Sequence, residues 1–167
     1  MPVDTQHALV VFHLAGQLAA IPLENVDRIA PMAQLARPPG LPAPLEGILN
    51  LAGTAVPVLR LDRLLALPEQ PPGLYSMLIV LKGVSNGRVA ILVDRVSEIL
   101  PLPGSAFLPV AKDHSFNACA EAAVTVRGEI VHVLSPARIL IEQEREVLSE
   151  YQATAQRRLQ DWDREGL

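Results

Sequence analysis

Few residues in this chain combine the types and spacings that catalysis or metal binding requires. The four histidines are scattered, and none forms an i,i+4 pair or stands beside a cysteine, so no metal site is expected. Asp94 has no second carboxylate or histidine at a spacing that suggests acid–base chemistry, and a role at a turn or junction is expected. Cys119 is the single cysteine, which is typical of a small buried hydrophobe. With no phosphate loop, nucleophile elbow or kinase motif, we expect no catalytic residue, no metal and no cofactor. The histidines are His7, His13, His114 and His132.

The composition excludes several functional classes. Half of the 167 residues are hydrophobic and 19% are charged, so the chain can form a packed core. The net charge of −4 gives no electrostatic basis for nucleic-acid binding, because phosphate contacts need clustered lysines and arginines. No apolar run of about 18 residues is present, and the N-terminus lacks the features of a secretory signal. We therefore expect a cytoplasmic protein that binds other proteins.

The chain repeats itself, which indicates two copies of one small unit. Residues 20–32 align with residues 90–102 at a shift of 70 without a gap. Residues 53–59 then align with residues 128–134 at a shift of 75, followed by Arg63-Leu64-Leu65 over Arg138-Ile139-Leu140. Two ordered blocks at nearly the same shift are hard to obtain by chance.

Each copy is predicted to consist mainly of short strands. Residues 7–14 and 77–81 are rich in valine, isoleucine and leucine, as strands are. Four or five strands per copy suit a small closed barrel, and one continuous sandwich is the alternative. A helical turn at residues 61–67 follows the first copy, and the proline-rich residues 68–73 connect the copies. Hairpin turns are expected at Asn86-Gly87 and at residues 15–17, 52–54 and 127–129.

Three segments resemble the CheW-like chemotaxis coupling proteins. Residues 9–26 are similar to the opening of that family. Residues 47–61, G-I-L-N-L-A-G-T-A-V-P-V-L-R-L, are similar to its G-x-x-N-L-R-G-x-x-x-P-V-x-D-L signature. Residues 91–99, I-L-V-D-R-V-S-E-I, resemble its I-x-V-D-x-V-x-x-[IV] segment. The resemblance covers about residues 8–141, in the order and spacing of the family.

The resemblance implies an all-β fold of two SH3-like five-stranded β-barrels with a C-terminal α-helix. The CheW-like domain would span residues 1–141, with the first barrel at about 15–70 and the second at about 75–136 together with the N-terminal strand.

The resemblance also implies a non-catalytic adaptor that binds the cytoplasmic tip of a methyl-accepting chemoreceptor and a CheA-type histidine kinase at receptor arrays of the inner membrane. Two alternatives remain: a coupling protein of a non-flagellar system that serves surface sensing or pili, and a ligand-sensing regulatory domain on the same fold. A deep polar pocket between the barrels would favour the ligand-sensing alternative.

By resemblance, the partner-binding residues are Gly47, Asn50, Ala52, Gly53 and Arg60. Gly53 is expected to supply a positive φ, and Asn50 to satisfy nearby backbone groups. Ala52 stands where the family has arginine, and Arg60 where it has aspartate. Alanine cannot replace a charged contact. Either the partner has changed to match, or this chain is a specialised paralogue.

Residues 137–167 predict an amphipathic helix with one apolar stripe. The stripe either docks on the chain's own barrels or forms a partner or self-association surface. Leu159 and Trp162 are assigned to the partner surface, and residues 139–148 to docking. Two proline-rich segments, 31–44 and 100–109, carry apolar side chains that either cover the barrel ends, as expected for most of them, or face a partner. The stripe comprises Leu148, Tyr151, Ala155, Leu159 and Trp162.

Overall fold

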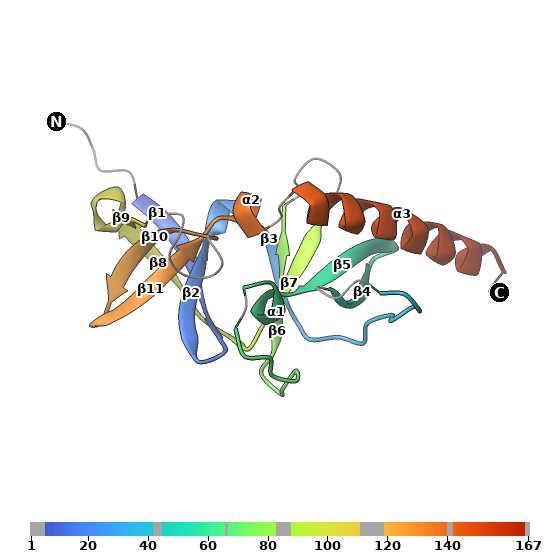
Figure 1. The fold of residues 1–167 in the computed structure, drawn as a ribbon, viewed down its shortest axis with the longest axis horizontal. Helices are drawn as coiled ribbons and strands as arrows, with labels where there is room; N and C mark the ends of the chain where they lie inside the picture. The colour runs from blue at the N-terminus through green and yellow to red at the C-terminus, as the bar shows by residue number, and fades with distance from the viewer. Residues whose placement is uncertain are drawn as a thin grey trace.

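The computed structural model describes residues 6–41, 45–65, 67–82, 88–110, 119–139 and 142–165, which form two β-sheets and a long C-terminal helix (Figure 1). The six-stranded sheet has the spatial order β8-β1-β2-β11-β10-β9, and the five-stranded sheet has the order β3-β6-β7-β5-β4. The predicted mainly-β fold of two strand units with a C-terminal helix is therefore confirmed. None of the helices in the described ranges is long and apolar enough to cross a bilayer.

The strands and helices have the following bounds. The six-stranded sheet contains β1 (Gln6–Leu14), β2 (Gln17–Pro22), β8 (Arg95–Pro103), β9 (Leu108–Pro109), β10 (Ala120–Val126) and β11 (Glu129–Leu134). The five-stranded sheet contains β3 (Val26–Pro31), β4 (Leu45–Leu51), β5 (Thr54–Arg60), β6 (Met77–Leu81) and β7 (Val89–Val93). The helices are α1 (Leu61–Leu64), α2 (Pro136–Ile139) and α3 (Glu142–Glu165), with 3₁₀ turns η1 (Leu23–Asn25) and η2 (Gly104–Ala106).

The two sheets have equivalent strand orders, but neither sheet is formed by one copy of the repeat. Strand β1 of the first copy pairs with β8 of the second, and β2 pairs with β11, which β10 follows. Strands β6 and β7 of the second copy join β3, β5 and β4 of the first. Each sheet has a parallel pairing at the same place, β2 with β11 and β7 with β5. The repeated segments 20–32 and 90–102 contain the crossings from one sheet to the other.

This exchange agrees with the expected place of the N-terminal strand in the second unit, but it differs from the expected bounds of about 15–70 and 75–136 for the rest of the two barrels. Strand β2 lies in the six-stranded sheet with β1, and β6 and β7 complete the five-stranded sheet. The two-residue β9 adds a sixth strand to the expected five. A sequence repeat identifies equivalent segments, but strand pairing within a copy and between copies buries the same apolar residues. The repeat therefore leaves the pairing undetermined.

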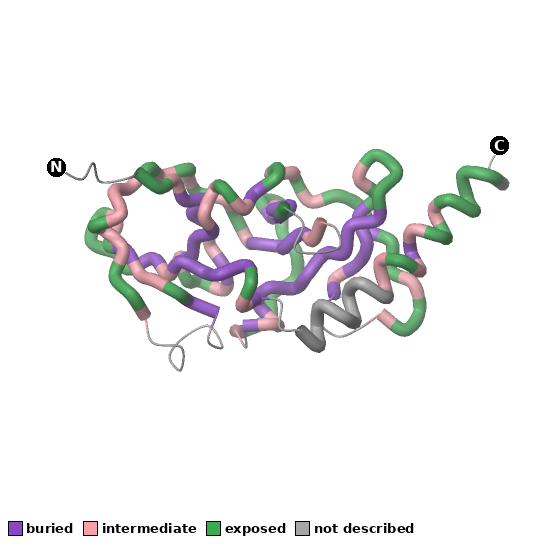
Figure 2. Tube along the Cα trace, turned by 90° about the horizontal axis from the view of Figure 1, so that it is seen from above, coloured by how far each residue is buried: buried purple, intermediate pink, exposed green. Residues whose placement is uncertain are grey.

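The central strands are buried on both faces, which explains their unbroken apolar sequences. In β1, Leu9 and Val11 contact a cluster inside the six-stranded sheet, whereas Val10 and Phe12 belong to a cluster shared by the two sheets. Strand β6 alternates in the same way between a cluster inside the five-stranded sheet and the shared one. Figure 2 shows buried residues running along the strands through the middle of the molecule. The two sheets are thus joined by a common hydrophobic core.

The hairpin turns predicted at residues 15–17, 52–54 and 127–129 are confirmed. Each turn has a positive φ at two successive residues, as type I′ turns require. The first residue of each turn is not glycine, although this conformation costs roughly 1–2 kcal/mol for a residue with a β-carbon. The Asn86-Gly87 turn and His114 lie outside the described residues. The values are 50° and 76° for Ala15 and Gly16, 52° and 88° for Ala52 and Gly53, and 49° and 80° for Arg127 and Gly128.

The proline-rich segments cover apolar clusters, as predicted. Leu35 is buried in the cluster of the five-stranded sheet, and Ala36 forms a β-bridge with Ile48. In the second segment, Leu102 and Phe107 pack on the cluster of the six-stranded sheet.

Candidate functional site

The signature segment 47–61 forms the β4–β5 hairpin, whose turn is exposed. Asn50, Ala52, Gly53 and Thr54 are all solvent-exposed. The backbone N–H of Gly53 donates a hydrogen bond to Asn50 Oδ1 at 2.8 Å, which confirms that the asparagine satisfies a backbone group of the turn. No atom lies within 4 Å of a β-carbon placed on Gly53, so the positive φ and not crowding accounts for the glycine. The turn is rigidly defined and open to a partner.

Helix α3 lies along the outside of this hairpin (Figure 1). Gln156 accepts a hydrogen bond from the Ala55 backbone N–H at 2.8 Å and donates one to the Gly53 carbonyl at 2.9 Å. Gln152, one helical turn earlier, donates to the Ala55 carbonyl at 2.8 Å. The parallel pairing of β5 with β7 covers only Val58 to Arg60, so the two glutamine amides satisfy backbone groups beyond that pairing.

The middle of the apolar stripe of α3, from Tyr151 to Leu159, docks on the chain's own sheet, and the side chain of Leu148 lies outside the described residues. Ala155 is buried against Ile48 and Ala55, and Tyr151 and Leu159 are partly buried in the same cluster. Leu159, which was assigned to a partner surface, packs partly on the five-stranded sheet, so its partner role stays a prediction. Trp162 is different, with 70% of its surface exposed beyond the edge of that contact.

Gly47 is a packing residue and does not lie on an exposed surface. It is buried, and a β-carbon on it would lie 2.7 Å from Leu35 Cβ and 2.9 Å from the Ala36 carbonyl oxygen. The backbone of Ala36 exchanges hydrogen bonds of 2.9 and 2.8 Å with Ile48. Glycine is needed here so that the segment before β4 can approach the strand closely.

Arg60 is buried too, and its exposed fraction of 7% excludes the direct partner contact expected from the resemblance. Its guanidinium forms ion pairs with Asp62 at 2.9 Å and with Glu46 at 3.1 Å. It also donates a hydrogen bond to the Gln70 carbonyl at 2.7 Å. Arg60 thus joins β4, the start of α1 and the connector between the two copies. The reason for the wrong assignment is that a charged residue in a signature suggests a surface, whereas here two carboxylates compensate its burial.

The electrostatics of this cluster follow from its hydrogen bonds. The hydrogen bond to Asp62, with a smaller one to Glu46, holds the pKa of Arg60 well above its ordinary value, although burial opposes the shift. Burial acts to raise the pKa of Asp62, but hydrogen bonds from Arg60 and from the Gln70 and Arg63 backbone N–H groups outweigh it and lower that pKa. Arg60 and Asp62 are therefore expected to be charged near neutral pH.

The other residues singled out for their chemistry have structural roles. Asp94 Oδ2 accepts a hydrogen bond from the Ala15 backbone N–H at 2.8 Å, which confirms the predicted turn role and ties the β7–β8 crossing to the β1–β2 turn. Cys119 is buried, as predicted, and its thiol donates to the Arg138 carbonyl at 3.3 Å. Burial lowers the pKa of His132. Within the described ranges, no three histidine, cysteine or acidic residues are grouped as a metal site requires.

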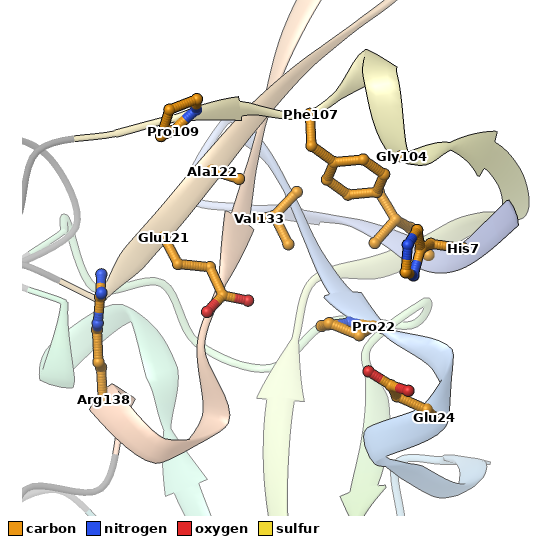
Figure 3. A pocket seen from close by; sticks show the side chains of 11 residues that line it. His7, Pro22, Glu24, Gly104, Phe107, Pro109, Glu121, Ala122, Val133 and Arg138 are labelled. Atoms are coloured by element: carbon orange, nitrogen blue, oxygen red, sulfur yellow. The ribbon is translucent and has the colours of Figure 1, made fainter. Parts of the chain in front are cut away.

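A pocket of about 550 Å³ opens at one end of the six-stranded sheet (Figure 3). Its walls come from β1, β2, β9, β10 and β11 with η1, η2 and α2, so it lies within one sheet and not between the two. Apolar residues, including Leu9, Phe107 and Val133, line part of it. The ionisable lining residues are His7, Glu24, Glu121 and Arg138.

The structure brings together only part of the set assigned by resemblance. Asn50, Ala52 and Gly53 share the exposed turn, whereas Gly47 and Arg60 are buried away from solvent. Sequence reasoning missed Gln152 and Gln156, which bond to the turn and to β5. Their i,i+4 spacing beside the apolar stripe was visible, but many exposed helices carry such polar residues.

Comparisons with known proteins agree with this fold. Residues 8–144 match the family described as CheW-like domain. The chemotaxis protein CheW of Treponema pallidum (strain Nichols) is 28% identical over 100 residues, which are 58% of this chain and 59% of that protein. The chemotaxis protein CheW of Rhizobium meliloti (strain 1021) is 24% identical over 141 residues, 83% of this chain and 90% of that protein. The crystal structure of the scaffolding protein TtCheW from Thermoanaerobacter tengcongensis matches the fold with a TM-score of 0.75 at 20% identity, covering 86% of this chain and 92% of that one.

Proposed function

This chain belongs to the CheW-like family of chemotaxis proteins, and we propose that it is a non-catalytic adaptor that couples methyl-accepting chemoreceptors to a CheA-type histidine kinase. The observation that carries the proposal is the match of residues 8–144 to the family, with the signature segment forming the β4–β5 hairpin. In this proposal the protein works in the cytoplasm, beside receptor arrays at the inner membrane.

The exposed turn at Asn50 to Thr54 is the part of the signature best placed to meet a partner. The residues that replace the family's charges support a changed contact. Ala52 offers only a methyl group at the exposed turn, and Arg60 is engaged inside the protein. We therefore expect that the partner of this chain has no carboxylate placed to contact residue 52, where the family has arginine. That favours a specialised signalling system, which includes a non-flagellar pathway for surface sensing or pili.

The test is recovery of both partners from the protein's own cells. The tagged protein is purified under mild conditions, and co-purifying chemoreceptors and a CheA-type kinase are identified by mass spectrometry. The proposal expects both, in amounts that fall when the exposed turn is altered by Thr54→Glu while the melting temperature is unchanged. Recovery of neither partner from cells that express them would contradict the proposal, as would turnover of a substrate that survives repurification and depends on one residue.

The observation that favours the second candidate function, a ligand-sensing regulatory domain, is the pocket of Figure 3. Its location within one sheet differs from the pocket between barrels that this alternative requires. Binding of a metabolite that alters kinase activity through this protein would support the alternative.

A further inference from the structure

The two hairpins β4–β5 and β10–β11 have the same irregularity at the same place. The register of β4 against β5 shifts around Glu46, and the register of β10 against β11 shifts around Glu121. Each glutamate is thus the extra residue of a β-bulge, which re-aims a side chain. Glu46 and Glu121 therefore occupy equivalent positions in the two sheets.

The equivalent positions differ in what neutralises the carboxylate. In the five-stranded sheet, Glu46 is 12% exposed and pairs with Arg60, the last residue of β5, at 3.1 Å. In the six-stranded sheet, the pair of Ala120 with Leu134 is equivalent to the pair of Leu45 with Leu59. Ser135, the residue after Leu134 at the end of β11, therefore stands in the place of Arg60. Ser135 is buried but carries no charge. The cation present in one half of the molecule is therefore missing from the other.

The pocket of Figure 3 is lined by Glu121, which is exposed, but not by Ser135. Glu121 and Glu24 line it, and Figure 3 shows both carboxylates directed toward its open space. Among the described residues, neither glutamate forms an ion pair. Arg138 also lines the pocket, but its guanidinium donates to the Ala120 carbonyl at 3.1 Å and forms no ion pair with Glu121. The lining thus holds two carboxylate side chains, Glu24 and Glu121, against one guanidinium, that of Arg138.

We propose that this pocket binds an arginine side chain of a partner protein, with the guanidinium on Glu121 and the aliphatic stem on the apolar wall. The equivalent corner of the same molecule supplies the precedent, because there Glu46, together with Asp62, holds the guanidinium of Arg60. Leu9 and Val133 offer apolar surface to the stem, and the ring of Phe107 can contact the cation. A volume of about 550 Å³ exceeds one side chain, so residues that flank the arginine are accommodated too. The site is separate from the β4–β5 turn and does not depend on the proposed function.

The experiment uses the full chain and the peptide acetyl-Leu-Arg-Leu-amide, with a second peptide in which citrulline replaces arginine. Citrulline keeps the shape of arginine but loses the charge. Binding is measured by titration calorimetry and located by amide chemical shifts in NMR spectra. The arginine peptide is expected to bind at least about tenfold more tightly than the citrulline peptide, since a charge-assisted hydrogen bond is lost. The shifts should fall on residues that line the pocket.

Variants of the chain provide the controls. Glu121→Gln is expected to lower the affinity for the arginine peptide by about tenfold or more. Glu129→Gln, which changes an exposed glutamate outside the pocket, should leave that affinity unchanged. Ser135→Arg should place a cation beside Glu121 from within the chain and abolish binding of the arginine peptide. If this variant does not fold, the effect of Glu121→Gln on binding still tests the proposal. Equal binding of the two peptides, no binding at millimolar peptide, or no effect of Glu121→Gln would overturn the proposal. Equal affinity for free L-arginine would overturn the assignment to a partner's side chain.

Discussion

Replacing Arg60 by methionine is expected to lower the free energy of unfolding by about 3–5 kcal/mol, because it leaves buried carboxylates without their cation. Methionine retains an unbranched apolar stem but no charge. The guanidinium of Arg60 lies 2.9 Å from Asp62 and 3.1 Å from Glu46, and the side chains of these two acids are only 8% and 12% exposed. Arg60→Asp, which restores the family's residue, should destabilise at least as much, since it adds a third carboxylate to the cluster.

The stability lost in Arg60→Met is expected to depend on pH and to be larger at neutral than at acidic pH. In the wild-type protein the pKa of Asp62 is lowered by its hydrogen bonds, so its contribution to stability is present above the unfolded-state pKa and is lost as the pH falls through the folded-state pKa. In Arg60→Met the Asp62 carboxylate stays buried without the guanidinium. Protonating it then removes the free-energy cost of burying an unpaired charge. The difference between wild type and variant should therefore be smaller at pH 4 than at pH 7.

The assay is urea unfolding followed by circular dichroism, because the single tryptophan, Trp162, is exposed at the end of α3 and reports little on the sheets. Arg63→Met is the matched control. Arg63 pairs with the exposed Glu69 at 2.8 Å, and such surface pairs contribute at most about 1 kcal/mol. A loss below about 1 kcal/mol for Arg60→Met, or a loss equal to that of Arg63→Met, would refute the account of the buried cluster.

Three further substitutions test the hairpin and its surroundings. Gly47→Ala should destabilise by about 1–3 kcal/mol in urea unfolding, because its β-carbon would meet Leu35 and Ala36, whereas Gly73→Ala, with no atom within 4 Å of the added carbon, should be neutral. Gln156→Ala should cost about 1–2 kcal/mol through two lost hydrogen bonds, and Gln160→Ala, an exposed residue of the same helix, almost nothing; equal effects would contradict the docking of α3. Ala52→Arg should leave the melting temperature unchanged, since arginine already has the same φ at the equivalent turn of the second repeat. It should also give no gain in affinity for the cognate receptor in a binding assay, and a clear gain would show that the partner has not adapted to alanine.

Local features of the chain were determined by local sequence. The turns at residues 15–17, 52–54 and 127–129 were predictable because a glycine between two apolar runs supplies the positive φ that a two-residue hairpin needs. The helix within residues 137–167 was predictable because its apolar residues repeat at helical spacing. The roles of Asp94 and Cys119 followed from the absence of any chemical partner nearby in the sequence.

The partners of charged and strand residues were decided only by the tertiary structure. The family signature gave the turn residues Asn50 and Gly53 correctly, but it could not distinguish an arginine on the surface from Arg60, which is buried against Glu46 and Asp62. Likewise, the stripe of α3 indicated a buried face without indicating that Leu159 docks on the chain's own hairpin.

The sequence by itself determined that the protein is built from two related β-units followed by a helix, because periodicity and turn chemistry depend on neighbouring residues. It did not determine that β2 pairs with a strand of the second copy, while β6 and β7 pair with strands of the first. The physical reason is that equivalent strands of the two copies have the same apolar pattern, so both arrangements bury them equally well. The choice between them, like the ion pairs that Arg60 forms with Glu46 and Asp62, depends on contacts between residues far apart in the chain.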